Sequence, residues 1–244
     1  MQPGPLRNAY LEALGIDRWV PRDAPPETGA LPESGVAAAA ASSARAPAAS
    51  PAMAPSSTDW TVLREQVAGC TACELCKTRT QTVFGVGNTR AEWLVIGEAP
   101  GGEEDRQGEP FVGRAGQLLN SMLLAIGLPR ETVFIANILK CRPPGNRDPK
   151  PEEVARCLPF LAAQIALLKP KIILAVGRIA AQNLLGSDAP LARLRGKLHH
   201  FGAAATPLVI TYHPAYLLRT PSDKRKAWED LKFARATYAR LAGA

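Results

Sequence analysis

Short apolar runs that alternate with amphipathic helical stretches most limit what this chain can fold into. The clearest run is WLVIG at 93–97, a continuous apolar stretch that a glycine stops, as expected for a strand buried on both faces. Strand–helix alternation of this kind indicates parallel strands with helices on both faces of the sheet. The sequence therefore predicts an α/β fold. Further strands are expected at 133–137, 172–177 and 208–211, and helices at 59–68, 115–126, 151–168, 178–185 and from about 222 onward.

Two of these helical stretches carry specific start signals. Pro151 occupies the favoured first position of a helix, and an apolar stripe follows it as far as Leu168. Ser222 or Asp223 is placed to cap the last helix. We expect five residues of that helix to face the core: Ala227, Leu231, Ala234, Tyr238 and Leu241.

Composition divides the 244 residues into three parts. Residues 24–58 are mostly Ala, Pro, Ser and Gly, with too little bulky apolar surface to offset the entropy of ordering, which predicts a disordered linker. Residues 1–23 contain a short amphipathic segment, 7–22, that includes Trp19. This segment is either an ordinary chain end or a docking peptide. Residues 59–244 are then expected to form one domain with a full core.

The net charge and the lack of export signals limit which partners and which cell compartment are expected for this protein. The formal net charge is +7 and the pI is near 9.4, which suits a polyanionic partner. The chain has no apolar run near 18 residues, so no membrane contact is expected, and its N-terminus shows no basic-then-apolar signal pattern. We therefore expect the protein in the cytoplasm, where reduced thiols favour metal ligation over disulfides.

The five cysteines follow a spacing typical of metal ligands. Cys70, Cys73 and Cys76 form a CxxCxxC run, and Cys141 and Cys157 follow much later in the chain. Two thiolates from a tight turn, joined by two that only folding can bring near, meet the needs of a four-cysteine metal or iron–sulfur site. The cysteines therefore predict such a site.

Polar or Gly/Pro-rich sequence follows three of the four predicted strands. These ends are GEAPG at 97–101, NILKCR at 137–142 and YHP at 212–214. Ligands bind beyond the carboxyl ends of strands in open parallel sheets, so these ends predict a catalytic cleft. Glu98 lies at the first end, and Glu104 belongs to the acidic run that follows. Such a run is either a solvated face or the source of a carboxylate that acts as a base or positions water.

Three further residues near these ends are candidates for binding a flat ring. Phe111 is either core or a stacking plate, because Pro and Gly frame it in a loop. Asn137 either stabilises a turn or uses its donor and acceptor to bind a base edge. His213 is either structural or a hydrogen-bond donor to an oxygen on which negative charge accumulates.

Other residues are candidates for contacts to a nucleic acid. Tyr216 and Leu217, beside His213, are either core or a wedge that enters the gap left by a displaced base. Arg193, Arg195 and Lys197 lie in a Gly-containing loop, where they either remain solvated or hold phosphates.

Three segments, with the cysteines around them, resemble the family 4 uracil-DNA glycosylases, the iron–sulfur members of their superfamily. The segments are GEAPGGEEDRQGEPFVGRAGQLL (97–119), NILKCRPPGNRDP (137–149) and TYHPAYLLR (211–219). The resemblance covers about residues 70–240 and implies a three-layer α/β/α domain with a four-stranded parallel sheet. It also implies an enzyme that flips deoxyuridine out of DNA and hydrolyses its N-glycosidic bond. Uracil is released and an abasic site remains, which is the first step of base-excision repair.

The resemblance also implies residue roles. Phe111 matches the ring that stacks on uracil, Asn137 the base-recognising amide and His213 the donor near uracil O2. Glu98 and Ala99 match the loop that closes over the base.

Two positions that the resemblance covers bear on the reaction and on the DNA. Leu217 lies where the superfamily inserts a side chain into the duplex. Better-known superfamily members have a water-positioning Asp where this chain has Ala99, so Glu98, then Glu104, are the candidates to replace it.

For the cofactor and partners, the resemblance implies one structural [4Fe–4S] cluster held by Cys70, Cys73, Cys141 and Cys157. Cys76 is then a free thiol beside it. The partner implied by the resemblance is uracil-containing DNA, double- or single-stranded. The resemblance does not cover residues 7–22, and there the bulky apolar residues alone suggest docking on a replication or repair protein. A monomer at the nucleoid is expected.

A different class of protein also accounts for part of the sequence. A non-catalytic iron–sulfur module, either an electron carrier or a redox-sensing DNA-binding protein, explains the cysteines and the charge. It leaves GEAPG, Phe111, Asn137 and His213 unexplained, although all lie at or near predicted strand ends.

Overall fold

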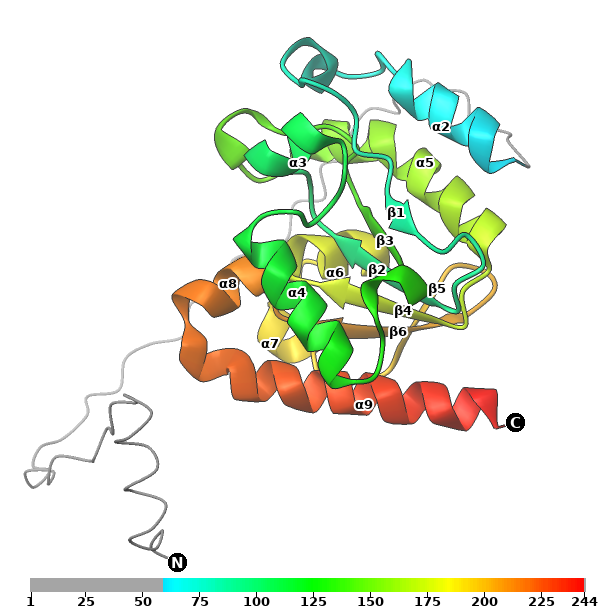
Figure 1. Ribbon diagram of the computed structural model, residues 1–244, viewed down its shortest axis with the longest axis vertical. Coiled ribbons are helices and arrows are strands. Elements are labelled where there is room, and N and C mark those ends of the chain that lie inside the picture. Colours follow the sequence, from blue (N-terminus) through cyan, green and yellow to red (C-terminus); the bar gives the residue numbers. More distant parts are fainter. Residues whose placement is uncertain (1–58, 244) are drawn as a thin grey trace, which may run out of the picture. The chain divides into compact units, whose positions relative to one another are not determined.

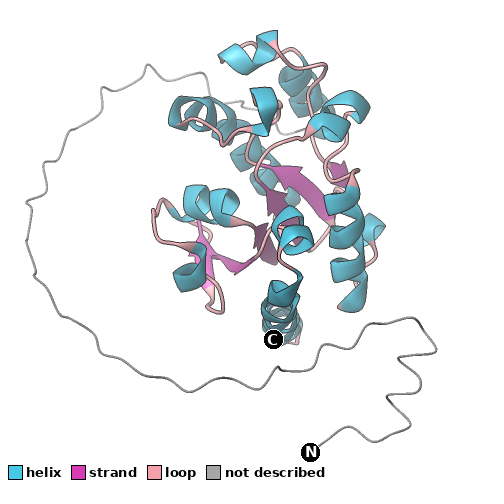
Figure 2. Cartoon of the chain, turned by 90° about the vertical axis from the view of Figure 1, so that its left-hand side faces the viewer, coloured by secondary structure: helices cyan, strands magenta, loops and turns pink. Residues whose placement is uncertain are grey.

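The computed structural model describes residues 59–243. A single mixed sheet with strand order β1-β3-β2-β4-β6-β5 forms its centre (Figures 1 and 2). The four inner strands are parallel, as predicted, and the two edge strands are antiparallel to their neighbours. The inner strands are β2 (Trp93–Gly97), β3 (Phe134–Asn137), β4 (Ile172–Val176) and β6 (Thr206–Thr211), and the edges are β1 (Val86–Gly87) and β5 (His199–Phe201).

Helices begin close to the predicted positions because their start signals are local. Asp59 caps α2 by accepting hydrogen bonds from the backbone amides of Thr61 and Val62. The other start confirmed in detail is that of α5, at Pro151. The helices are α2 (Trp60–Ala68), α3 (Gly102–Gln107), α4 (Arg114–Ala125), α5 (Pro151–Leu168), α6 (Arg178–Leu185), α7 (Leu191–Leu194), α8 (Pro214–Arg219) and α9 (Lys224–Ala242). Short 3₁₀ turns lie at Glu74–Lys77, Arg130–Thr132, Pro144–Asn146 and Pro221–Asp223.

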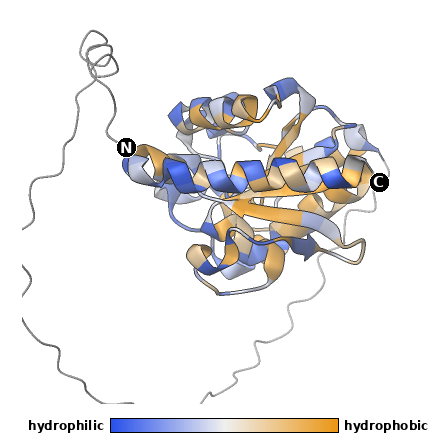
Figure 3. Ribbon diagram, turned by 90° about the horizontal axis from the view of Figure 1, so that it is seen from below, coloured by the Kyte–Doolittle hydropathy of each residue, from blue (hydrophilic) through white to orange (hydrophobic). Residues whose placement is uncertain are grey.

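The sheet separates two hydrophobic cores, because successive strand residues point to opposite faces. Leu94 and Ile96 pack into the core shared with α2, α5 and α6, whereas Trp93 and Val95 pack into the core shared with α4, α8 and α9. Figure 3 shows hydrophilic and hydrophobic residues along α9, as expected for a helix that covers one face. These layers confirm the three-layer α/β/α prediction.

Several details differ from the sequence predictions, among them the short helices α3, α7 and α8, which were not expected. The edge strands β1 and β5 were not predicted, because runs of two and three residues carry almost no periodic signal. Leu241 was expected in the core but is 42% exposed; it lies in the last turn of α9, beyond Tyr238, the last residue of that helix packed against the core. Asp223 precedes α9 without a side-chain capping bond and instead accepts a hydrogen bond from the hydroxyl of Tyr216.

Between Asp59 and Gly243, no helix is both long enough and apolar enough to span a bilayer.

Candidate active site and cysteine cavity

The carboxyl ends of the four parallel strands line one cleft. Glu98 follows β2, Asn137 ends β3, and His213 follows β6. The structure therefore brings together side chains that are far apart in the sequence, as the strand-end argument predicted. Among the residues predicted for the site, seven line this cleft: Glu98, Ala99, Glu104, Phe111, Asn137, His213 and Tyr216.

Phe111 and Asn137 meet above Gly97, where a side chain would not fit. A Cβ atom at Gly97 would lie 2.5 Å from Asn137 Oδ1 and 2.6 Å from Phe111 Cζ. Phe111 itself adopts a φ of 56°. Its backbone carbonyl packs against Gly116 so closely that a Cβ atom at position 116 would lie only 1.8 Å from the carbonyl oxygen. A left-handed φ at a bulky residue is uncommon and strained, so the surrounding chain holds this ring in a defined position.

The Asn137 amide is buried with an unpaired oxygen. The residue is 2% exposed, and its Oδ1 has no hydrogen-bond partner within the described chain. A buried polar atom without a partner costs free energy comparable to a lost hydrogen bond. The arrangement therefore calls for a ligand with a donor at this point.

His213 is held as a neutral ring whose second nitrogen is a donor. It precedes α8, and its Nδ1 accepts a hydrogen bond from the backbone amide of Ala215 at 3.2 Å. An accepting Nδ1 requires the proton on Nε2. Burial, and then the nearby Arg219 charge, lower the pKa of His213 to about 4, so the ring is neutral at pH 7. Its centroid lies 5.6 Å from that of Phe111.

Glu98 lies in the same cleft with a raised pKa. Burial, and then the Asp148 carboxylate, raise the pKa of Glu98 to about 7, while Arg178 opposes them. Arg178 donates to Asp148 Oδ2 at 2.6 Å. A carboxyl with a pKa near neutrality is matched to proton transfer or to positioning of a water at physiological pH.

Glu104 uses its oxygens within the fold. Oε2 accepts from the backbone amide of Gly101 at 3.1 Å, and Oε1 accepts from the amides of Val112 and Gly113 at 3.1 and 3.3 Å. These bonds tie the start of α3 to the loop that presents Phe111. Glu104 was the second candidate for positioning water; it lines the cleft and both of its oxygens accept backbone hydrogen bonds, so that role stays a prediction.

The predicted wedge residue does not face the cleft. Leu217 is 1% exposed and packs in the core on the α4–α9 side of the sheet, so the prediction that it enters a duplex is corrected. Its neighbour Leu218 is 37% exposed. Tyr216 lines the cleft, stacks on Tyr212 at 5.2 Å between centroids and donates to Asp223 Oδ2 at 2.6 Å.

The predicted basic loop divides in two. Arg193 and Lys197 are exposed, whereas Arg195 makes a two-point ion pair with Asp230, with Nε and Nη2 at 3.0 and 2.9 Å from its two oxygens. Asp230 is 1% exposed, so Arg195 neutralises a buried carboxylate and is not free to bind a phosphate. That part of the prediction is corrected.

Sequence analysis missed several polar residues of the cleft. Asn146 and Asp148 lie in the segment after β3, and Arg178 follows the third predicted strand directly. Arg219 ends the short helix that His213 begins. Their proximity to strand ends was the available signal, but charged residues in loops are usually solvated and therefore attract little notice.

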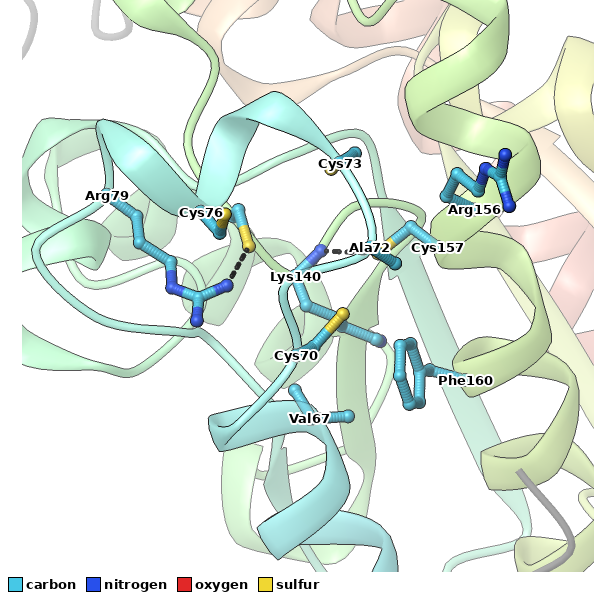
Figure 4. Close-up of a pocket in the computed structure, with 11 residues that line it drawn as sticks. Val67, Cys70, Ala72, Cys73, Cys76, Arg79, Lys140, Arg156, Cys157 and Phe160 are labelled. Carbon is cyan, nitrogen blue, oxygen red and sulfur yellow. Dashed lines mark hydrogen bonds between the residues drawn. The ribbon is translucent and has the colours of Figure 1, made fainter. Parts of the chain in front are cut away.

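A second cavity, on the side of the domain near α2 and α5, is lined by all five cysteines (Figure 4). The free space between these side chains is small, about 10 Å³. Nη1 of Arg79 donates to Cys141 Sγ at 3.0 Å, and the backbone amide of Lys140 donates to Cys157 Sγ at 3.1 Å. Burial raises the pKa of Cys157 to about 12 and also raises the pKa values of Cys73 and Cys141. The structure therefore brings the two distant cysteines to the CxxCxxC turn, as the spacing predicted.

The donor set of this cavity is soft. Thiols converge there from three segments, and thiolates are ligands that zinc and iron–sulfur clusters prefer. Across residues 59–243, however, no three Cys, His, Asp or Glu side chains are grouped as a single metal ion requires. The cysteine thiols of the cavity are therefore suited to bind zinc or an iron–sulfur cluster. Their sulfur atoms, however, are not arranged around a single point, as one metal ion would require.

Comparison with known proteins agrees with the fold and with the family that the sequence motifs resemble. Residues 84–232 match the profile of the uracil DNA glycosylase superfamily. The chain therefore belongs to this superfamily and, within it, to the type-4 uracil-DNA glycosylases. It is 45% identical to the type-4 uracil-DNA glycosylase of Archaeoglobus fulgidus over 70% of this chain and 88% of that one. The type-4 enzyme of Thermotoga maritima is 42% identical over 72% of this chain and 92% of its own, and that of Pyrobaculum aerophilum is 44% identical over 69% and 89%.

Proposed function

We propose that this protein hydrolyses the N-glycosidic bond of deoxyuridine in DNA, releasing uracil and leaving an abasic site for base-excision repair. The observation that carries the proposal is the buried Oδ1 of Asn137, which has no hydrogen-bond partner within residues 59–243 and lies near the ring of Phe111, itself a neighbour of the His213 ring. A flat base with a donor beside an acceptor would satisfy this amide at both of its atoms. Uracil presents that pair on one edge, its N3–H and a carbonyl oxygen.

The site requires the base to leave the duplex, because Asn137 is too deeply buried to reach a stacked base. Enzymes that act on bases extrude the target nucleotide and hold it by stacking and by hydrogen bonds to its edge. Phe111 supplies the stacking face and Asn137 the edge contacts. His213 supplies a neutral Nε2–H donor to the uracil oxygen on which charge accumulates as the bond breaks.

Glu98 is the group we assign to the attacking water. Ala99 offers no carboxylate, and Glu104 is bound to backbone amides. An ionised Glu98 accepts a proton from the water and stabilises positive charge on the sugar. Asp148 and Arg178 lie beside it, and their mutual ion pair sets the local field.

The cysteine cavity supports a structural [4Fe–4S] cluster with Cys70, Cys73, Cys141 and Cys157 as ligands. These four residues would hold the cluster, and through them the CxxCxxC turn would be linked to the segment after β3 and to α5. Cys76 remains a free thiol in this assignment. The donor set supports the proposal, since these four thiols come from three segments that α2, β3 and α5 hold in place.

DNA contacts are assigned to the rim of the cleft. Arg178 and Arg219 line it, and Arg193 and Lys197 are exposed. Arginine and lysine at such positions bind phosphates without base selectivity. Leu218, with 37% of its surface exposed, replaces Leu217 as the side chain of that turn that contacts the duplex.

The test is release of uracil from a labelled, uracil-containing oligonucleotide in a single turnover. We expect excision in the presence of EDTA, because water and fixed dipoles suffice for this hydrolysis and no added metal ion or cofactor is needed. His213→Ala should slow it, whereas His200→Ala, which removes an exposed histidine from β5, should leave it unchanged. Protein that binds this DNA and leaves the uracil in place would favour the non-catalytic iron–sulfur module instead.

A further inference from the structure

A fully buried lysine lies between the cleft and the cysteine cavity. Lys140 is 1% exposed, and its Nζ donates to the backbone carbonyl of Asn137 at 2.9 Å and to Gln164 Oε1 at 2.6 Å. Its backbone amide is directed at Cys157 Sγ (Figure 4). A lysine is almost never buried to this extent unless its amine has partners, and here both side-chain partners are neutral.

Gln164 anchors the amine to the helix on that side of the sheet. It lies in α5, is 0% exposed, and donates through Nε2 to the carbonyl of Phe84 at 2.8 Å. The chain Phe84–Gln164–Lys140–Asn137 is therefore a continuous buried hydrogen-bond network. Every connection in it can be removed by one substitution of similar shape.

The orientation of the Asn137 amide depends on its backbone. Asn137 Oδ1 makes no hydrogen bond within the described chain, so no bond to that oxygen fixes the side chain before a base arrives. Asn137 is the last residue of β3 and lies opposite Gly97 of β2, and the next two backbone amides, of Ile138 and Leu139, donate to the carbonyls of Gly97 and Glu98. The carbonyl of Asn137 is held by Lys140 Nζ at this strand end. Because the side chain starts from this backbone, a shift of the backbone moves the amide with it.

We propose that Lys140 and Gln164 are positioning residues that hold the backbone of Asn137, and through it the amide that binds the flipped base. The inference rests on the function proposed above. Neither side chain lines the cleft, so neither touches the substrate. Lys140 acts on the reaction only through Asn137.

The experiment is a double-mutant cycle with Lys140→Met and Asn137→Ala, measured as the single-turnover rate of uracil release. Lys140→Met keeps the length of the side chain and removes the donor. Loss of a hydrogen bond from a buried amine lowers the rate by about 10- to 100-fold. In the Asn137→Ala background the same substitution should have little further effect, because the group it positions is absent. Gln164→Met should lower the rate by a smaller factor, since Lys140 keeps one acceptor.

Two further measurements separate positioning from general destabilisation. Inhibition by free uracil should weaken in Lys140→Met, while affinity for an abasic oligonucleotide stays as in the unaltered protein. Leu63→Ala removes a fully buried side chain of the same core from α2, so it lowers the melting temperature but leaves the rate and uracil inhibition of the folded protein unchanged.

Several outcomes would overturn the inference without touching the proposed function. One is a Lys140→Met protein with unaltered rate and uracil inhibition. Another is a Lys140→Met substitution that lowers the rate by the same factor in the unaltered protein and in Asn137→Ala. If the effects of Lys140→Met and Asn137→Ala on the rate are independent in this way, and Lys140→Met also loses the visible absorption, then Lys140 acts on the cysteine cavity instead. An unaltered protein that releases no uracil would instead contradict the function itself.

Discussion

At the scale of single residues, the pKa values of Glu98 and His213, which line one cleft, are shifted in opposite directions. Each shift suits its residue to a different task. Burial disfavours the charged form of both, and so raises the pKa of Glu98 to about 7 and lowers that of His213 to about 4. Between these values His213 is a neutral donor, while Glu98 changes from acid to carboxylate. Of these two groups, Glu98 is therefore the one that titrates near neutral pH.

The first prediction concerns pH. The single-turnover rate should rise as pH increases through about 7, because only ionised Glu98 activates water. No falling limb from His213 is expected above pH 5, since its ring is already neutral there. Glu98→Gln should flatten the rise and lower the rate above pH 7. A rising limb that persists in Glu98→Gln would assign the base to another group.

The same shift has a consequence for stability. Folding raises the pKa of Glu98 above its ordinary value of 4.5, so its contribution to stability is present below that value and is lost as pH rises through about 7. Glu98→Gln should therefore raise the melting temperature at pH 8 more than at pH 5. Thermal unfolding at the two pH values measures the difference, and an equal change at both would show that the carboxyl is not desolvated.

Base choice is the third prediction, and it belongs to Asn137. Asn137→Asp should relax or invert the preference for uracil, because an ionised carboxylate cannot both donate and accept. A mismatched polar contact in a closed pocket costs roughly 1–3 kcal/mol. Comparing excision rates for uracil and other base analogues in one oligonucleotide measures the change. Unaltered selectivity would remove Asn137 from base recognition.

At the scale of elements, α5 connects the two sites. It carries Cys157 toward the cysteine cavity, Gln164 toward Lys140, and Glu153 at its first turn. Glu153 accepts from the guanidinium of Arg147, and its side chain is only 4% exposed, so the helix also holds the loop that follows β3. The loop bearing Asp148 is thereby fixed against the cleft.

The fourth prediction concerns the cysteines that α5 and the CxxCxxC turn supply. Cys73→Ala or Cys157→Ala should abolish the brown visible absorbance and lower the melting temperature, because four thiolates close a [4Fe–4S] cluster. Cys76→Ala should retain both and is the matched control, since Cys76 lines the same cavity. Loss of absorbance in Cys76→Ala together with its retention in Cys157→Ala would reverse the ligand assignment.

At the scale of the whole molecule, residues 1–58 lie outside the part that the structure describes, so their predicted division into a segment at 1–23 and a linker at 24–58 remains a prediction. We propose that residues 7–22 dock on a replication or repair protein. A linker of the length of 24–58 spans on the order of 30–35 Å on average. It would keep the glycosylase domain near a partner at an effective concentration of up to about millimolar.

The fifth prediction follows from that proposal. Deleting residues 1–58 should leave uracil release from a short oligonucleotide unchanged, because every residue assigned to the site lies beyond them. The same deletion, or Trp19→Ala alone, should weaken binding to purified replication and repair proteins. If the deletion instead slows excision on naked DNA, the segment belongs to the catalytic domain.

The sequence by itself determined the four inner strands, the longer helices and the part of the site at the strand ends. The apolar runs, Asp59, Pro151 and the sequence at the strand ends act over a few residues, so they predicted the parallel sheet, the helix starts and the cleft at Glu98, Asn137 and His213. Only the tertiary structure decided the rest. Leu217 and Leu218 are adjacent and equally apolar, and the packing of α8 against α4 and α9 alone buries the first and exposes the second. Likewise, Arg195 pairs with Asp230, which is 35 residues away in the sequence, because a buried carboxylate requires a cation as partner. The local sequence around Arg195 contains no pattern that predicts this pairing.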